Sequence, residues 1–471
     1  MRIHILPFIF GLTFLFCGSL YGQVDPAPYG PVPTPAQVSW QRMEMNMFCH
    51  FGPNTFTGEE WGSGKEAEDV FAPSALNCSQ WVNVAKSAGF GGIILTAKHH
   101  DGFCLWPNPY SDHTVRQSSW RNGKGDVLKE LSKACRKGKI KFGIYISPWD
   151  RNAPTYGTPA YNDVFLRTLR HAHTNYGTIF EQWFDGANGE GPNGKKQDYD
   201  WKSFNAQTLK LQPKAVIFSD VGPGCRWVGN ENGECGRTCW SRLNVTGYAP
   251  GKDAPSQDTL NTGNYNGECW IPAETDVSIR PGWFWRESEH PKSVAELLDI
   301  YFNSVGRNSL LLLNVPPDNR GLIPTEDSLR LLEFKTALDS VFAHDLTKNA
   351  VHLIASEVRN QRHNPVNLFD DNYDTYWATD DGITTATVEL QFDSPQTFNK
   401  VMLQEYIPLG QRVEKFHIEV VDDAGEWRTI AEETTIGYKR IVLTETVTTN
   451  KVRIVIDKSR ACIVMNRIAL F

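Results

Sequence analysis

Imidazole and carboxylate side chains stand directly after several apolar runs of the sequence. Such groups can transfer protons, attack an electrophilic carbon, coordinate a metal or hydrogen-bond a polar ligand. Because the carboxyl ends of parallel strands meet at one edge of a sheet or barrel, we expect these groups to converge. They are His50, His99, His100, Asp101, Asp150, Asp185 and Asp220.

Two of the acidic residues suit the cleavage of a glycosidic bond. That reaction needs one ionised and one protonated carboxyl group on either side of the bond. Asp185, which lies between Trp183 and Gly186, is the candidate for the ionised group. Glu231 is the candidate for the protonated group, because the indole of Trp227 lies nearby in sequence and apolar neighbours raise a carboxyl pKa. The competing acids are Glu60, Glu234 and Glu274.

The three histidines allow two interpretations. His50, His99 and His100 could bind a metal with Asp101 or Asp185 as a carboxylate ligand, as in a metal-dependent hydrolase. Adjacent residues on a strand point to opposite faces, so both members of the His-His pair reach one ion only if the strand has ended. We therefore favour hydrogen bonds to a polyhydroxylated substrate.

The elements that must position these groups alternate between strand and helix from residue 43 to residue 343. Apolar strands that are each followed by a helix indicate a parallel sheet covered on both faces. At roughly 300 residues this rhythm fits a (β/α)8-like barrel, whose two missing strands we expect within residues 225–290. The expected strands are 45–48, 92–97, 141–147, 179–184, 215–220 and 310–315, and the helices are 78–88, 126–137, 161–176, 201–211, 293–302 and 325–343.

The pattern changes after residue 346, where apolar and polar residues alternate in short runs with no helix between them. Such runs indicate a C-terminal β-sandwich. We expect strands at 388–392, 416–420, 439–443, 452–456 and 467–471, with turns at 422–425 and 448–450. The chain is thus an α/β protein with a catalytic domain over residues 23–345 and a β-sandwich over residues 346–471.

Residues 1–22 have the pattern of a signal peptide: Arg2, a short apolar run and a small-residue region before Gln23. Export to the periplasm or the extracellular space is the expected location. A lipoprotein anchored through Cys17 is the less favoured alternative, because the bulky Phe16 precedes it. No later run approaches 18 apolar residues, so we expect no transmembrane segment.

Composition excludes some partners. The 47 Lys and Arg residues against 54 Asp and Glu residues give a net charge of −7, which argues against nucleic acid binding. Aromatic residues make up 12% of the chain and include 15 Trp, which fits either sugar stacking or a large core. Export permits disulfides, and Cys235 with Cys239, or Cys225 with either, are the plausible pairs. The sequence indicates no oligomeric state.

Four strings of the first domain resemble the exo-α-L-fucosidases of glycoside hydrolase family 29. They are Phe48-Cys-His-Phe-Gly52, Ala97-Lys-His-His-Asp-Gly-Phe103, Trp183-Phe-Asp185 and Leu311-Leu-Leu-Asn-Val-Pro-Pro317. The resemblance covers roughly residues 35–345. It implies a retaining double displacement on a terminal fucose of an oligosaccharide or glycoconjugate, without a metal or cofactor in catalysis.

The same resemblance assigns roles to residues. It makes Asp185 the nucleophile and points to Glu231 as the acid/base, at a separation of about 5–5.5 Å. The run from Arg226 to Glu231 and the run from Trp270 to Trp285 resemble the branch that cleaves α-1,3 and α-1,4 linkages of Lewis-type glycans. The implied substrate contacts are His50, Glu60, Trp61, His99, His100, Trp183, Arg226, Glu274 and Trp285.

The C-terminal part resembles the discoidin, or coagulation-factor C type, domain through Asn367-Leu-Phe-Asp-Asp371 and Thr375-Tyr-Trp377. The domain could brace the barrel or bind sugar as a carbohydrate-binding module. Asp370, Asp371 and Asp374 are candidate ligands of a structural calcium ion. Two other functions stay open: a non-catalytic glycan-binding protein, and a fucosidase of broader linkage specificity.

Overall fold

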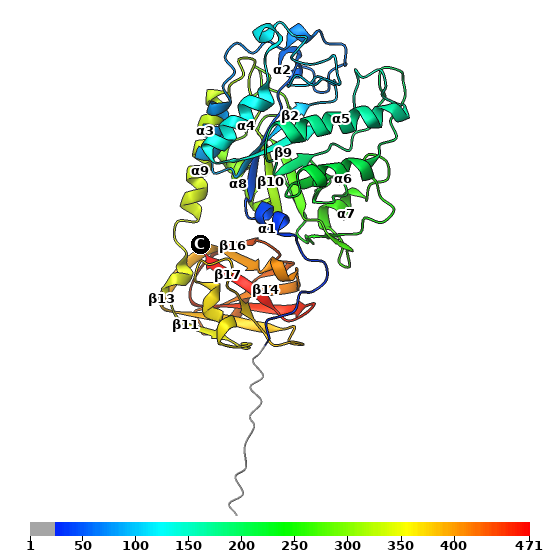
Figure 1. The fold of residues 1–471 in the computed structure, drawn as a ribbon. Helices are drawn as coiled ribbons and strands as arrows, with labels where there is room; N and C mark the ends of the chain where they lie inside the picture. Colours follow the sequence, from blue (N-terminus) through cyan, green and yellow to red (C-terminus); the bar gives the residue numbers. More distant parts are fainter. Residues whose placement is uncertain (1–23) are drawn as a thin grey trace, which may run out of the picture.

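The computed structural model describes residues 24–471 as a barrel that stands on a β-rich C-terminal domain (Figure 1). The expected signal peptide and Cys17 lie outside the described residues. Within residues 24–471 no helix is both long enough and apolar enough to cross a membrane.

Eight parallel strands close the barrel in the order β1-β10-β9-β6-β5-β4-β3-β2. This confirms the expected fold class, and the two strands that the sequence left unplaced are β6 and β9. The barrel strands are β1 (Met45–Cys49), β2 (Gly92–Lys98), β3 (Lys141–Ile146), β4 (Glu181–Trp183), β5 (Val216–Ser219), β6 (Cys225–Trp227), β9 (Ala273–Ser278) and β10 (Ser309–Asn314).

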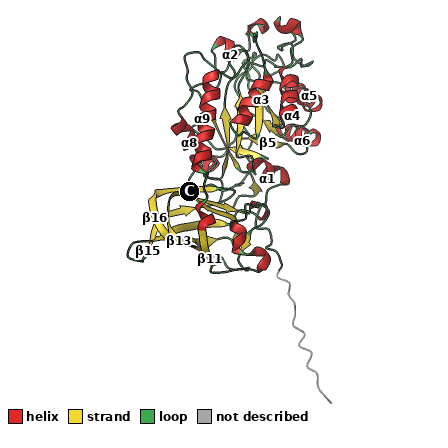
Figure 2. Ribbon diagram, turned by 90° about the vertical axis from the view of Figure 1, so that its left-hand side faces the viewer, coloured by secondary structure: helices red, strands yellow, loops and turns green. Residues whose placement is uncertain are grey.

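Helices cover the outer face of the barrel (Figure 2). Their starts are set by local capping: the Asp126 carboxylate accepts from the Lys129 backbone at the start of α4, and Ser293 and Glu296 form a capping box at the start of α8. The helices are α1 (Pro35–Gln41), α2 (Asn54–Thr57), α3 (Cys78–Ser87), α4 (Val127–Gly138), α5 (Pro159–Asn175), α6 (Trp201–Leu211), α7 (Gln257–Thr262), α8 (Val294–Asn303) and α9 (Thr325–Val341).

The regular alternation breaks between β5 and β9. Only a short turn joins β5 to β6, and residues 228–272 then make a long excursion that contains α7 and the small antiparallel pair β7 (Arg242–Leu243) and β8 (Cys269–Trp270). This irregular path explains why the sequence showed poor periodicity there. Glu231 lies at the start of the excursion.

The C-terminal domain is an antiparallel sandwich, as expected. One detail of the sequence prediction was wrong: the expected strand 439–443, the turn 448–450 and the strand 452–456 form one long strand, β16. Bulges in its pairing with β13 bend the two strands, so no turn is needed. The strands are β11 (Ala350–Ala355), β12 (Trp377–Ala378), β13 (Ala386–Glu405), β14 (Val413–Val421), β15 (Trp427–Thr434), β16 (Arg440–Ser459) and β17 (Val464–Leu470).

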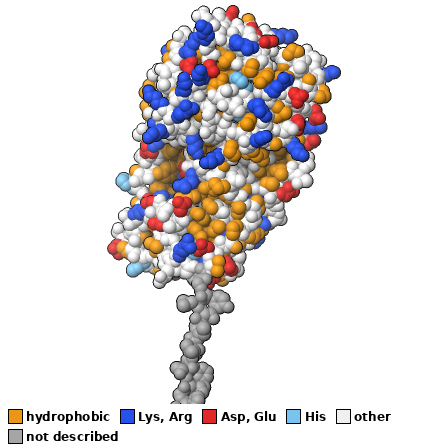
Figure 3. Space-filling model, viewed as in Figure 1, with side chains coloured by type: hydrophobic (Ala, Val, Ile, Leu, Met, Phe, Trp, Pro, Cys, Tyr) orange, Lys and Arg blue, Asp and Glu red, His pale blue; other side chains and the backbone are white. Residues whose placement is uncertain are grey.

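The sandwich holds the excursion through buried hydrogen bonds. The Gln411 side chain accepts from the Ser241 backbone N–H at 2.7 Å and donates to the Cys239 carbonyl at 2.9 Å. Thr435 Oγ1 accepts from the Cys239 N–H at 3.0 Å. Hydrophobic side chains also gather at the waist between the two domains (Figure 3), where Pro33, Val38 and Pro408 line a groove. The second domain therefore braces the excursion that follows β6.

We predict that Gln411→Met destabilises the protein by about 1–3 kcal/mol, because the change keeps the side-chain length but leaves the buried Ser241 N–H without an acceptor. Urea titration measures the free energy of unfolding. The control is Gln257→Met at an exposed position of α7, which should change stability by less than about 0.5 kcal/mol. Equal stabilities for the two variants would contradict the bracing role of Gln411.

Candidate active site

A small cavity, about 80 Å³ in volume, opens at the carboxyl ends of the barrel strands. Aromatic, imidazole and carboxyl groups share its wall, and no lysine or arginine lines it. The lining residues are Phe48, His50, Glu60, Trp61, His99, His100, Tyr145, Trp183, Asp185, Glu231, Asp276 and Trp283. The cavity thus brings together residues from both halves of the barrel, including Asp185 and Glu231.

Asp185 follows β4 and is held from two sides. Its Oδ1 atom accepts from the Ala187 backbone N–H at 2.7 Å, and its Oδ2 atom accepts from the Tyr145 hydroxyl at 3.1 Å. Burial raises the pKa of Asp185, while these two hydrogen bonds favour the ionised form and lower it. The balance gives a carboxylate with a fixed orientation and a basicity above that of a solvated aspartate.

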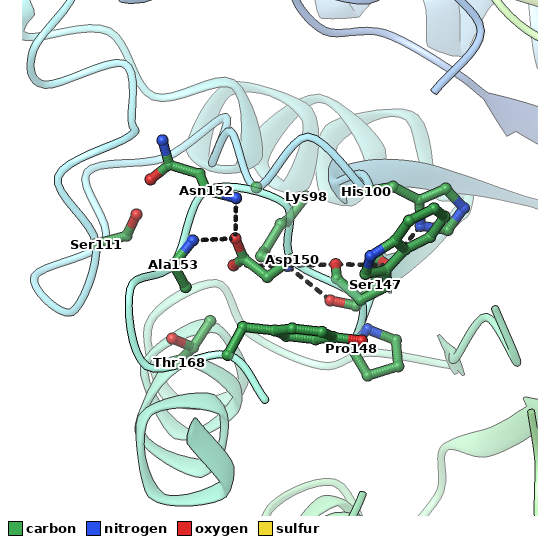
Figure 4. A network of polar contacts seen from close by, with 12 residues as sticks. Lys98, His100, Ser111, Ser147, Pro148, Asp150, Asn152, Ala153 and Thr168 are labelled. Carbon is green, nitrogen blue, oxygen red and sulfur yellow. Dashed lines mark hydrogen bonds and ion pairs between the residues drawn. The ribbon is translucent and has the colours of Figure 1, made fainter. Parts of the chain in front are cut away.

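His100 faces this carboxylate, with Nε2 at 3.6 Å from Asp185 Oδ2. Its Nδ1 atom bonds to Ser147 Oγ at 2.8 Å (Figure 4). Behind this contact the buried Lys98 ammonium donates to the Ser147 carbonyl at 2.8 Å and pairs with Asp150 Oδ2 at 3.1 Å. The ion pair joins the ends of β2 and β3 and so fixes the imidazole beside Asp185.

All three histidines of the cavity are neutral near pH 7. Burial is the main cause: it lowers the pKa of His50 and of His100 to about 3 and that of His99 to well below its usual value. His50 Nδ1 bonds to Asn314 Oδ1 at 2.9 Å, whereas His99 Nδ1 is buried with no hydrogen-bond partner. Neutral imidazoles suit hydrogen bonds to hydroxyl groups.

The predicted metal alternative finds no matching geometry. Within residues 24–471, three or more potential ligand atoms come within 4.8 Å of one another only at Glu181, Cys225 and Glu274. His100 does face Asp185, but among the described residues no third potential ligand atom joins this pair. Asn314 holds the His50 ring and Ser147 holds the His100 ring.

Glu231 lies at the mouth of the cavity, partly exposed. Its Oε2 atom accepts from the Trp283 indole N–H at 3.1 Å. Partial burial and the charge of Asp185 raise the pKa of Glu231, and the indole hydrogen bond opposes this shift.

Trp283 also donates its backbone N–H to Glu60 at 2.6 Å, and Glu60 pairs with Arg286 at 2.7 Å. Burial raises the pKa of Glu60, and the Trp283 N–H and the Arg286 cation oppose this shift.

Three of the expected contact residues lie outside the cavity. The Arg226 side chain is fully buried and donates to the Leu260 carbonyl at 2.8 Å, because alternation along β6 turns it out of the barrel while its neighbours turn in. Glu274 points inward but lies one layer below the cavity, under Trp183. Trp285 is half-buried beside the site, and Trp283 closes the cavity instead.

The sequence analysis missed four residues of the cavity wall: Phe48, Tyr145, Asp276 and Trp283. Tyr145 and Phe48 occupy inward positions of β3 and β1 that look like ordinary apolar core. Asp276 had a signal, because Glu274, Asp276 and Ser278 place polar groups at every second position of β9. The buried Asp276 Oδ1 atom has no hydrogen-bond partner, and burial raises the pKa of Asp276 well above its usual value.

Two predictions outside the cavity are not matched by the structure. Cys225, Cys235 and Cys239 are buried free thiols. The candidate calcium ligands do not converge either: Asp371 pairs with Lys348 and Arg467, both at 2.8 Å, and Asp370 accepts from the Asn372 backbone and from Thr375. Among residues 24–471, no group of three potential ligand atoms within 4.8 Å of one another includes these aspartates.

A larger cavity of about 590 Å³ lies at the opposite end of the barrel, near the amino ends of β3 and β4. Its wall combines apolar residues with Arg136, Lys141 and Lys214 and contains no carboxyl or imidazole group. Of these two cavities, the smaller one therefore holds the carboxyl and imidazole groups.

Comparisons with known proteins show similarity in both domains. Residues 29–339 match the family described as Alpha-L-fucosidase, and residues 352–467 match the F5/8 type C domain. Alpha-L-fucosidase 1 of Arabidopsis thaliana is 44% identical over 95% of this chain and 88% of its own. A solved glycoside hydrolase 29 family member from an unknown rumen bacterium is 40% identical, with a TM-score of 0.83 over 94% of this chain and 78% of its own. A Ruminococcus gnavus GH29 fucosidase in complex with fucose is 32% identical, with a TM-score of 0.87 over 95% of this chain and 96% of its own.

Proposed function

The chain belongs to the alpha-L-fucosidase family, a family of glycoside hydrolases, and we propose that it is a retaining exo-enzyme that releases terminal α-1,3- or α-1,4-linked L-fucose from branched, Lewis-type glycans. The observation that carries the proposal is the cavity itself. It holds Asp185 in a fixed orientation and Glu231 at the mouth, and its small volume favours a single terminal sugar.

In the proposed first step, ionised Asp185 attacks the anomeric carbon of fucose and forms a fucosyl-enzyme while the bond to the leaving oxygen breaks. The hydrogen bonds from Ala187 and Tyr145 keep the carboxylate oriented for this attack. Glu231, protonated, transfers its proton to the leaving oxygen. In the second step Glu231 removes a proton from water, which attacks the fucosyl-enzyme and regenerates Asp185.

Recognition of fucose would depend on neutral groups, because the sugar carries no charge. His50, His99 and His100 offer ring nitrogens to the hydroxyl groups, and the unpartnered atom of His99 supports this role. The fucose methyl group would lie against Trp61 or Trp183. Trp61 is 58% exposed over the cavity, so part of its surface is available to a ligand. The proposed mechanism uses no metal and no cofactor.

The linkage preference rests on the residues around Glu231, where the run from Arg226 to Glu231 resembles the α-1,3/1,4 branch of the family. Arg226 supports that loop rather than the sugar, since its guanidinium is bonded to the excursion. A fucosidase of broader linkage specificity is the alternative. A non-catalytic glycan-binding protein is less favoured, because a binding site has no need for an acid at the mouth opposite a buried carboxylate.

We propose that the main role of the discoidin-like domain is to brace the barrel. Its buried contacts with residues 239–241 support this role. Sugar binding by the domain would be an additional property.

We expect the protein to hydrolyse both 4-nitrophenyl α-L-fucoside and a Lewis-type trisaccharide, with the higher kcat/KM on the trisaccharide. Asp185→Asn should lower kcat by about 10⁴-fold or more, because the amide cannot form the fucosyl-enzyme. Asp198→Asn, at an exposed position in the loop that follows Asp185, is the matched control and should leave kcat unchanged. If neither substrate is hydrolysed, the proposed fucosidase activity is excluded. Much better turnover of the aryl fucoside would exclude the linkage preference.

Trp283→Phe should shift the alkaline limb of the pH profile of kcat/KM to higher pH. In the wild type the indole hydrogen bond stabilises ionised Glu231. Losing this bond therefore raises the pKa of Glu231 and keeps the acid protonated to higher pH. The expected shift is about 0.5–1 pH unit. Trp285→Phe, two residues away and outside the cavity, is the control and should not move the limb. A limb that stays in place or moves to lower pH in Trp283→Phe would remove Glu231 from the acid role.

A further inference from the structure

Two glutamates lie directly beneath the cavity with no cation to balance them. Glu181 on β4 and Glu274 on β9 are both fully buried. Within residues 24–471 neither forms an ion pair with a lysine, an arginine or a histidine. Their carboxyl oxygens lie within 4.8 Å of each other and of the Cys225 sulfur. Two ionised carboxylates in such a place would carry a large desolvation cost in addition to their mutual repulsion.

The hydrogen bonds around the pair leave one position for a proton. Glu181 Oε2 accepts from the Trp40 indole at 2.8 Å, and Glu274 Oε1 accepts from the Trp183 indole at 2.8 Å. Glu274 Oε2 is buried and has no other partner. Burial raises the pKa of Glu181 to about 7 and that of Glu274 to well above its usual value. One O–H group between the two carboxyls would satisfy the remaining oxygen and halve the charge.

Trp183 connects this pair to the cavity. Its ring stacks on Phe218, with centroids 3.9 Å apart and planes 6° apart, and on Tyr145 at 5.2 Å. Stacking holds the plane of the indole but not its rotation within that plane. The N–H bond to Glu274 supplies the missing constraint. Tyr145 in turn donates to Asp185, so a shift of Trp183 reaches the proposed nucleophile through one neighbour.

We propose that Glu181 and Glu274 share one proton, and that Glu274 is thereby a positioning residue that holds Trp183 in the wall of the fucose site. The positioning effect on turnover rests on the proposed function, whereas the shared proton does not. The chain of contacts runs from Trp40 in α1, through the two carboxyls, to Trp183. These contacts link helix α1 to the fucose site. Along them, the glutamate pair carries a single negative charge.

Infrared spectroscopy tests the shared proton without a substrate. Because Asp276 and other buried carboxyl groups also have raised pKa values, the readout is the difference between the proteins. Near pH 6 we expect the wild type to show more C=O intensity from protonated carboxylic acid than Glu274→Gln or Glu181→Gln, by the equivalent of one carboxyl group. In each variant the amide donates to the remaining carboxylate, which is then ionised. Glu44→Gln is the control, because half-buried Glu44 pairs with Lys439, which favours its ionised form. An acid band of undiminished intensity in both variants would overturn the proposal, as would a metal ion bound at Glu181, Cys225 and Glu274 in purified protein.

Kinetics on the aryl fucoside test the positioning role. Glu274→Gln retains an acceptor for the Trp183 N–H and should stay within about threefold of the wild-type KM, whereas Glu274→Met should raise KM about tenfold. Trp183→Phe should have a similar effect, and the double variant should be no worse than the worse single variant. Additive effects would show that Glu274 does not act through Trp183. If Glu274→Met does not fold, Glu274→Leu, which also lacks an acceptor, gives the same coupling when compared in the wild-type and Trp183→Phe backgrounds. An inactive wild type with the acid band present would reject the proposed function and leave the shared proton standing.

Discussion

The site depends on how the closed barrel compensates for burying the charge of Asp185. Burial alone would neutralise this carboxyl group, and the Ala187 N–H and the Tyr145 hydroxyl oppose that effect. Tyr145 and the neighbouring His100 are in turn held by the residues around them. Tyr145 is fixed by its stack against Trp183, and His100 is fixed by Ser147 and the Lys98–Asp150 ion pair. The Lys98 and Arg286 cations thus lie outside the cavity wall, and neutral polar or aromatic groups contact Asp185.

The same constraint explains the asymmetry of the barrel. Glu231 must stay at the mouth, where partial exposure allows it to gain and lose a proton, and it lies on an excursion that has no long helix of its own. Gln411 and Thr435 of the C-terminal domain hold the returning part of that excursion. The second domain therefore contributes to the catalytic domain mechanically, whether or not it also binds sugar.

Much of the barrel could be predicted, because most of its strands are apolar runs with polar residues at their ends, and short β4 is flanked by apolar residues in the sequence. β6 and β9 could not be placed, since one is only three residues long and the other carries three polar residues that face inward. The cavity residues were predictable where a polar side chain ends a strand, as with His50 and Asp185. The depth and direction of a side chain were not predictable. Arg226 and Glu274 were both expected in the cavity. Strand alternation turns Arg226 out of the barrel, and Glu274 lies one layer below the cavity.

The central claim is that Asp185 forms a covalent bond to fucose within this cavity. Its most direct test is incubation with 2-deoxy-2-fluoro-fucosyl fluoride, which slows hydrolysis of a fucosyl-enzyme, followed by digestion and mass spectrometry of the peptides. The account predicts a single fluorofucosyl adduct on Asp185. An adduct on Asp276 or Glu231, or turnover of the aryl fucoside with no adduct at any residue, would contradict it.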